Sequence, residues 1–229
     1  MHIHEGVLHP AVLAAGWAIT AGGLSLGLKR LPTERIMHAA LLAAGFFVAS
    51  FIHFSVGAVN IHLTLNALVG LFLGWGAFPV IFTGLLLQAL LFNYGGLTVL
   101  GVNTAVMAMP AVLFGLALHR WLAARNTPAT VALAAQEAPS PSAPSARPCI
   151  TVPALPVVVA VVATLLCSNL LYVLALAASG KEFYPIARVA FVASLPLMAV
   201  EAPITLLVLR SIAKARPAAF TLGKQTPCL

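Results

Sequence analysis

Long apolar runs recur along the whole chain, and they constrain the fold more than any other feature. Each run approaches the ~20 residues that a helix needs to cross a hydrocarbon layer of about 30 Å. The composition agrees, because 61% of the residues are hydrophobic and 7% are charged, whereas soluble domains carry roughly a quarter charged residues. A soluble core could not bury this much apolar surface, so we expect an all-α integral membrane protein.

About seven transmembrane helices can be placed from the apolar runs and from the Gly, Pro and charged residues between them. We expect them at Val7–Leu28, Ile36–Phe54, Ile61–Trp75, Phe78–Phe92, Leu97–Leu122, Pro153–Ala178 and Pro185–Ala213. Gly74, Gly76 and Pro79 favour a break between the third and fourth runs. An odd number of spans places the two termini on opposite sides of the membrane.

The basic residues predict the orientation, because loops rich in Lys and Arg favour the cytoplasmic side. One side of the predicted bundle carries Lys29, Arg30, Arg35, Arg120, Arg125, Arg147, Arg210, Lys214, Arg216 and Lys224. Only Lys181 and Arg188 fall on the other side. We therefore expect an outer N-terminus and a cytoplasmic C-terminus. The net charge of +7 then reflects membrane topology, and no nucleic-acid partner is expected.

The apolar pattern is interrupted between residues 123 and 152 by a stretch rich in Ala, Pro and Ser. This composition is typical of a flexible linker, because it has too few large apolar side chains to order itself. We therefore divide the chain into three parts. Residues 1–122 hold the first five helices, residues 123–152 form a cytoplasmic linker, and residues 153–229 hold the last two helices and a cytoplasmic tail.

Polar residues from distant parts of the sequence fall at the same outer face in this arrangement. They are His2, His4, His53, Asn60, His62, Thr98, Asn103 and Thr104, together with the turn Asn93–Gly96. Lipid penalises polar side chains, so those retained in membrane helices or at their ends are functional candidates. The ordinary interpretation of each residue alone is a polar helix cap or an interhelical hydrogen bond.

The Met-His start is the sharpest signal in this group. Met1 should be retained, because methionine aminopeptidase removes Met only before small residues. A metal held by the Met1 amine, the His2 backbone nitrogen and His2 Nδ1 would close adjoining chelate rings in one plane. Such tetragonal nitrogen coordination is typical of Ni(II) or Cu(II). His62 is our candidate for the fourth nitrogen.

Further residues are candidates for hydrogen bonds that orient these ligands. We place Asn66 one turn beyond His62 on the same helix face. Gln88 and Asn103 come from the fourth and fifth helices, and His4 from the N-terminal segment.

Three segments taken together resemble the CbiM/NikM family. They are Met1–Gly6, with the sequence MHIHEG, Val59–Leu63, with VNIHL, and Gln88–Thr104, with QALLFNYGGLTVLGVNT. The resemblance covers the first half of the chain. It implies a substrate-capturing subunit of an energy-coupling factor (ECF) transporter for cobalt or nickel. The family's near-planar set of nitrogen ligands maps onto Met1, His2 and His62. His4 departs from the family, which often has Met, Pro or another residue there.

The resemblance further implies a multi-pass protein of a prokaryotic plasma membrane that captures Co²⁺ or Ni²⁺ outside. A transmembrane coupling subunit and paired cytoplasmic ATPases would move the ion inward, in some systems with a small accessory membrane subunit. The chain has no P-loop GxxxxGK[ST] pattern, so ATP hydrolysis is expected on a partner. The Met-His-Ile-x-Glu-Gly start is more similar to CbiM, which favours cobalt for cobalamin biosynthesis; a nickel importer is the alternative. The metal is cargo, and no catalytic cofactor is expected.

Two other function classes remain as alternatives. A metal-dependent membrane enzyme would build its centre from histidines and Glu201, although the sequence has no HExxH pair and no Asp. We expect Glu201 instead to pair with a buried Asn, Thr or backbone group, or to act as a proton-linked site. A channel or self-sufficient carrier would move metal without any ATPase.

Overall fold

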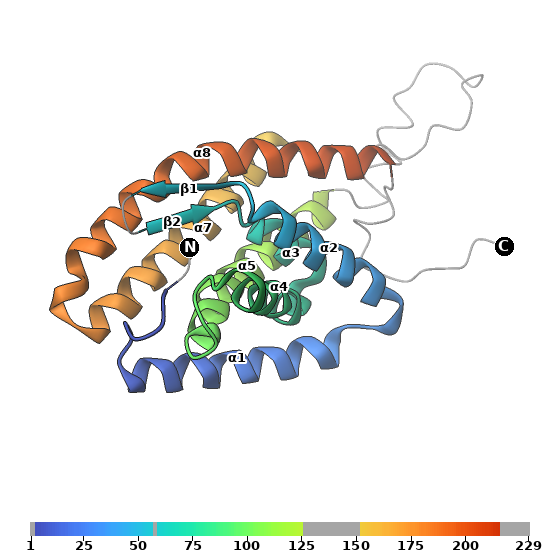
Figure 1. The fold of residues 1–229 in the computed structure, drawn as a ribbon. Helices are drawn as coiled ribbons and strands as arrows, with labels where there is room; N and C mark the ends of the chain where they lie inside the picture. Colours follow the sequence, from blue (N-terminus) through green and yellow to red (C-terminus); the bar gives the residue numbers. More distant parts are fainter. Residues whose placement is uncertain (1–2, 57–58, 126–151, 216–229) are drawn as a thin grey trace, which may run out of the picture.

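The computed structural model describes residues 3–56, 59–125 and 152–215. Within them the chain is helical apart from one short β-hairpin (Figure 1). The α-helices are α1 Pro10–Arg30, α2 Ile36–Ala49, α3 Asn66–Leu73, α4 Ala77–Phe92, α5 Leu100–Arg125, α7 Ala154–Ser179 and α8 Tyr184–Ala215. Short 3-10 turns lie at Thr33–Arg35, Gly74–Gly76 and Lys181–Phe183.

Helix α5 is the centre of the bundle. It packs against α1, α3, α4 and α7, while α7 pairs with α8. Figure 1 shows α1 and α8 on opposite sides, with α5 between them. Where α3 crosses α5, a Cβ added at Gly70 would overlap the Ala111 carbonyl, and one added at Gly115 would overlap the backbone of Gly70. Small residues at this crossing therefore let the two helices approach closely, as is common between membrane helices.

The ends of the helices follow from local sequence. Pro10 occupies the first position of α1, where a missing N–H costs nothing, and His9 Nδ1 accepts a hydrogen bond from the Ala11 N–H at 3.3 Å. The predicted break between the third and fourth helices is confirmed. Gly74 there has a φ of +52°, a left-handed conformation that favours glycine.

Among the described residues, five helical stretches are long and apolar enough to cross a bilayer. They are Pro10–Arg30, Asn66–Phe92, Leu100–Arg125, Ala154–Ser179 and Lys181–Lys214. Helices α3 and α4 together form one of these stretches. Helix α2 has 14 residues, fewer than the ~20 that span a bilayer. The expectation of a helical multi-pass membrane protein is confirmed. The number of about seven spans is not confirmed, and the orientation of the termini stays a prediction.

The segment between α2 and α3 differs from the prediction. We expected helix over Ile36–Phe54 and again from Ile61, but α2 ends at Ala49. Strands β1, His53–Val56, and β2, Val59–His62, follow and pair antiparallel. Polar and apolar residues alternate along this segment, and a period of two favours a strand over a helix.

The predicted linker and tail fall largely outside the described residues. Helix α5 continues to Arg125, so the first residues assigned to the linker are helical. Residues 126–151 and 216–229 lie outside the part of the chain that is described. The division of the chain into three parts stays a prediction.

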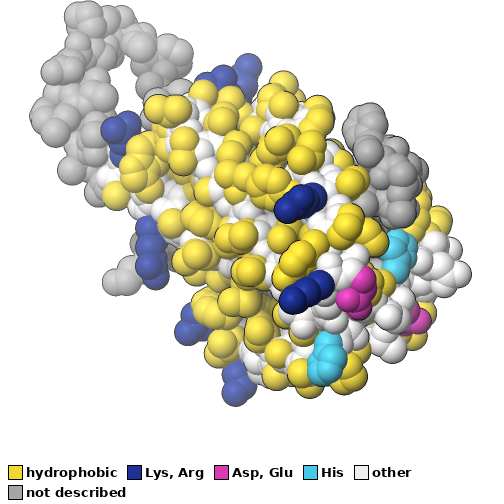
Figure 2. All heavy atoms as spheres, turned by 90° about the vertical axis from the view of Figure 1, so that its left-hand side faces the viewer, with side chains coloured by type: hydrophobic (Ala, Val, Ile, Leu, Met, Phe, Trp, Pro, Cys, Tyr) yellow, Lys and Arg dark blue, Asp and Glu magenta, His cyan; other side chains and the backbone are white. Residues whose placement is uncertain are grey.

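The surface separates charged side chains by type. Figure 2 shows a broad hydrophobic surface, with histidine and acidic side chains gathered on one side of the view and most Lys and Arg toward the other. Exposed large hydrophobic residues on α1, α7 and α8, such as Leu28, Leu155 and Leu207, suit contact with lipid. Segregation of basic residues to one end is what the positive-inside rule predicts for a membrane protein.

Candidate functional site

The first described residue is held in the protein interior. Ile3 is 1% exposed. Its N–H donates to Asn103 Oδ1 at 3.0 Å, and its carbonyl oxygen accepts from Asn103 Nδ2 at 3.2 Å. One amide side chain on α5 thus satisfies both backbone polar groups of a buried residue, as burial requires. The chain directly after the Met-His start is therefore fixed against α5.

Glu5 attaches the same segment to the connection between α4 and α5. Its N–H donates to the Gly95 carbonyl oxygen at 3.3 Å. Its Oε1 accepts from the N–H and the hydroxyl of Thr98 at 3.1 and 3.3 Å. Gly96, with a φ of +137°, lies so close that an added Cβ would overlap the Glu5 side chain. Glu5 therefore joins the N-terminal segment to the turn after α4, two parts of the chain that the sequence predicts at the same face.

His62 ends β2, and its side chain is 3% exposed. Its Nδ1 lies 3.2 Å from the carbonyl oxygen of Leu63. Because a carbonyl oxygen can only accept, this contact is a hydrogen bond in the tautomer that carries the proton on Nδ1. The basic lone pair is then on Nε2, the arrangement usual for a histidine that binds a metal.

The N-terminal segment and the segment that follows His62 share one hydrophobic cluster. Ile3 and Leu63 are both buried and belong to it, together with Val102 of α5 and Tyr172 of α7. Residues far apart in the sequence therefore lie in the same region of the molecule. This proximity brings the start of the described chain toward the His62 segment.

Helix α8 holds the connection between β2 and α3. Glu201 is 0% exposed. Its Oε2 accepts from the Thr64 N–H at 3.1 Å, and both of its carboxylate oxygens lie 3.1 Å from the Thr64 hydroxyl. On the other side, the Leu63 N–H donates to the Ile52 carbonyl oxygen at 3.0 Å, and Leu65 has a φ of +51°. The expectation that Glu201 pairs with a buried Thr or backbone group is confirmed.

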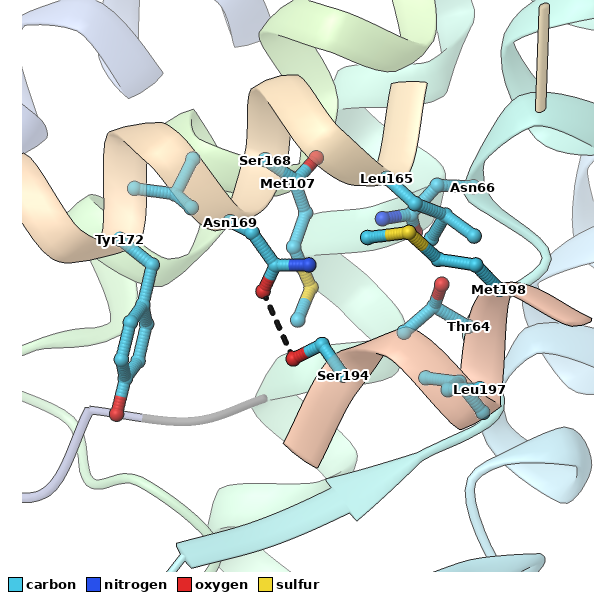
Figure 3. Close-up of a pocket in the computed structure, with 11 residues that line it drawn as sticks. Thr64, Asn66, Met107, Leu165, Ser168, Asn169, Tyr172, Ser194, Leu197 and Met198 are labelled. Atoms are coloured by element: carbon cyan, nitrogen blue, oxygen red, sulfur yellow. Dashed lines mark hydrogen bonds between the residues drawn. The ribbon is translucent and has the colours of Figure 1, made fainter. Parts of the chain in front are cut away.

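A cavity of about 30 Å³ lies between α3, α5, α7 and α8, beside Thr64 (Figure 3). Ser194 Oγ of α8 lies 3.0 Å from Asn169 Oδ1 of α7, as the dashed line in Figure 3 marks. Asn66 Oδ1 and Ser168 Oγ have no hydrogen-bond partner within the described residues. The walls of the cavity are mostly apolar, with a few polar atoms among them, and its volume is enough for a water molecule, which needs roughly 10–15 Å³.

The remaining predicted residues have different outcomes. Asn66 was expected on the same helix face as His62; this is wrong, because His62 is in a strand and Asn66 begins α3. Gln88 is 0% exposed, and neither of its amide atoms has a partner in the described part of the chain. The His4 side chain is exposed.

The proposed ligand set is only partly within the structure. Met1 and His2 lie outside the described residues. Across residues 3–56, 59–125 and 152–215, no group of three or more His, Cys, Asp or Glu side chains is arranged to hold a metal ion. The set of Met1, His2 and His62 therefore stays a prediction.

Sequence reasoning missed the contributions of Ile3 and Leu63. Both act through backbone atoms, so no side-chain type marks them. The sequence did contain a signal for Thr64. The alternation of polar and apolar residues in β2 continues to Thr64, and it places Thr64 on the same side of an extended chain as His62.

Comparison with known proteins gives a family match across residues 2–219. The family is described as "CbiM: Cobalt uptake substrate-specific transmembrane region".

Several relatives are similar over about half of the chain. A protein of Haemophilus influenzae with the provisional name of metal transport protein is 52% identical over 113 residues, which cover 49% of this chain and 55% of that protein. The "Cobalt transport protein CbiM 2" of Pelobacter propionicus is 31% identical, covering 56% and 60%. The "Fused nickel transport protein NikMN" of Rhodobacter capsulatus is 30% identical, covering 52% and 36%. The chain thus spans about half the length of the first of these relatives.

Two solved structures share the fold. One is a crystal structure of a transition metal transporter, with a TM-score of 0.63 and 24% identity, covering 94% of this chain and 93% of that one. The other is a truncated transition metal transporter, with a TM-score of 0.61 and 22% identity, covering 94% and 99%. At these identities the likeness establishes the fold.

Proposed function

Because the chain belongs to the CbiM family of cobalt uptake transmembrane proteins, we propose that it is the substrate-capture subunit of an ECF importer. The substrate is Co²⁺, with Ni²⁺ as the alternative. The ligands are the Met1 amine, the backbone and imidazole nitrogens of His2, and His62. Capture takes place at the outer face of a prokaryotic plasma membrane.

The docking of Ile3 is the observation that carries this proposal. Asn103 holds both backbone polar groups of Ile3, and Ile3 shares a buried cluster with Leu63. The residue that follows the Met-His start and the residue that follows His62 thus belong to one buried cluster, which supports the proposed approach of the two segments. A chelate formed between two chain segments needs this restraint, because an unrestrained N-terminus would lose conformational entropy on closing the site.

The chemistry of the donor set supports a late transition metal as the substrate. A planar set of nitrogens disfavours Zn²⁺, which prefers a tetrahedron, and offers Mg²⁺ and Ca²⁺ none of the oxygen ligands they require. At a given site the Irving–Williams order favours nickel over cobalt. Cobalt preference would therefore depend on geometry or on availability. The similarity of the Met1–Gly6 start to CbiM favours cobalt.

Import also needs partners that supply energy. We propose a transmembrane coupling subunit and paired cytoplasmic ATPases, since the sequence has no P-loop pattern of its own. Reconstituted vesicles would test this part: uptake of ⁵⁷Co²⁺ should require the partners and ATP. Uptake by the chain alone would favour a self-sufficient carrier instead.

Metal binding by the purified protein tests the ligand set. Calorimetry with Co²⁺ and Ni²⁺ should give high affinity for the wild type. We expect loss of high-affinity binding when one Gly is added before Met1, when His2→Ala removes the chelating imidazole, or when His62→Ala removes the fourth nitrogen.

The exposed side chain of His4 provides the matched control. His4→Ala should leave affinity within about threefold, because an exposed side chain that contributes no ligand has little to lose. Full affinity in the protein extended at its N-terminus would rule out the amine as a ligand. Full affinity in His62→Ala would show that another residue supplies the fourth ligand.

A further inference from the structure

The peptide group between Leu63 and Thr64 is hydrogen-bonded at both ends. Its carbonyl oxygen lies 3.2 Å from His62 Nδ1, and its N–H donates to Glu201 Oε2 at 3.1 Å. A trans peptide group is planar and directs its C=O and N–H in opposite directions. The imidazole therefore lies at the carbonyl end of this rigid peptide group, and a carboxylate of α8 lies at its N–H end.

The carboxylate in this arrangement is fully buried. Glu201 is 0% exposed, and the Thr64 hydroxyl lies within hydrogen-bond distance of both of its oxygens. These hydrogen bonds hold both the N–H and the hydroxyl of Thr64 against one carboxyl group. The low polarity of the surroundings strengthens these hydrogen bonds, and they leave few alternative conformations for the peptide plane.

We propose that Glu201 is a positioning residue that orients the His62 imidazole through the Leu63–Thr64 peptide group. The carboxylate holds the N–H, the plane fixes the carbonyl oxygen, and that oxygen requires the proton of His62 to be on Nδ1. Polarisation along the same chain of bonds makes Nε2 a better donor to a metal. This inference rests on the proposed function, since it takes His62 to be a ligand.

A consequence is that the second half of the chain contributes to metal capture. Glu201 comes from α8, and β2 contacts α8 directly. A shift of α8 relative to β2 would move the peptide plane and turn the imidazole. The ligand of the first half and a helix of the second half are thus connected by named hydrogen bonds.

Ni²⁺ titration of the purified full chain tests the inference, because planar Ni(II) has a visible absorption band that reports ligand geometry. Glu201→Gln keeps an oxygen acceptor but removes the charge, and we expect about tenfold weaker binding. Glu201→Leu removes the acceptor, and we expect weakening toward 100-fold, the range found when groups that orient metal ligands are lost. The absorption band at saturating Ni²⁺ should also change in both variants.

Two further variants separate positioning from stability. Thr64→Ala keeps the backbone N–H and should weaken binding by less than about threefold, because the connection runs through the peptide group. Thr205→Val changes a buried hydroxyl one turn along α8 that has no hydrogen-bond partner among the described residues. It should leave affinity and the band unchanged. Melting temperatures of the metal-free variants, measured in parallel, report any general loss of stability.

The outcomes distinguish this inference from the proposed function. Wild-type binding in His62→Ala would contradict the proposed function, and this inference with it. Loss of binding in His62→Ala, with wild-type affinity and band in both Glu201 variants, would overturn the positioning role alone. A loss in Thr64→Ala as large as in Glu201→Leu would overturn the route through the peptide group. If Glu201→Leu does not fold, the affinities and absorption bands of Glu201→Gln and Thr64→Ala test the inference.

Discussion

Ile3 is held through its own backbone groups, which bond the side chain of Asn103. Ile3 is buried, yet both of its hydrogen bonds use main-chain atoms. The sequence allowed Asn103 to be predicted as a residue that orients the metal ligands, because an amide inside a membrane helix is an unusual residue to retain. The sequence did not reveal that Ile3 is the partner of Asn103, because every residue other than Pro has the same backbone N–H and carbonyl groups.

Replacement of Asn103 by Ala should release this segment. The N–H and carbonyl oxygen of Ile3 would stay buried without partners, at a cost of about 1–3 kcal/mol for each group left unpaired. We expect hydrogen exchange over residues 3–8 to rise at least tenfold and metal affinity to fall. Hydrogen–deuterium exchange followed by mass spectrometry measures the first effect.

Thr104→Val is the matched control for this prediction. Thr104 is the next residue on α5, is 0% exposed, and donates only to the Leu100 carbonyl oxygen within the same helix. It should leave exchange over residues 3–8 unchanged. Equal exchange in Asn103→Ala and the wild type would show that Asn103 does not hold the segment.

At the scale of elements, most helices could be predicted and the hairpin could not. The apolar runs marked α1, α4, α5, α7 and α8 to within a few residues, since bilayer thickness sets their length. The error over β1 and β2 has a physical reason. The segment from Val59 to Asn66 alternates apolar and polar residues, but its high hydropathy resembles a span when averaged over a long window. Tertiary contact with α8 then supports the extended conformation.

The crossing of α3 and α5 gives a prediction at this scale. Gly70→Ala should destabilise the protein by roughly 1–3 kcal/mol, because the added Cβ meets the backbone carbonyl of Ala111 and the helices must separate. Gly22→Ala in α1 is the control, since an added Cβ there meets nothing within 4 Å. It should be neutral or stabilising by up to about 1 kcal/mol. Thermal unfolding in detergent compares them, and equal melting temperatures would contradict the close approach.

At the scale of the whole molecule, the prediction that stays open is topology. Basic residues lie in the last turns of α1 and α8, and the positive-inside rule assigns both ends to the cytoplasm. The family match extends over residues 2–219, so it includes α7 and α8. The sequence could not reveal how α8 contacts the His62 segment, because pairing between distant helices leaves no local pattern.

Thiol labelling tests the orientation. In a protein with its cysteines replaced by Ser, Glu34→Cys and Glu182→Cys introduce thiols at exposed positions. A membrane-impermeant maleimide should label Glu182→Cys in intact cells and Glu34→Cys only after permeabilisation. The reverse pattern would invert the orientation, and labelling of both from one side would require a different number of spans between them.

The buried isoleucine after the Met-His start has a consequence for kinetics. Withdrawing that side chain and breaking its two hydrogen bonds costs about 3–5 kcal/mol, so the detached form of the segment would make up roughly one molecule in a hundred to one in several thousand. If Met1 and His2 hold the ion as proposed, the ion leaves only when its bonds to nitrogen break and this segment moves away. The burial of Ile3 would therefore slow the spontaneous loss of a bound ion.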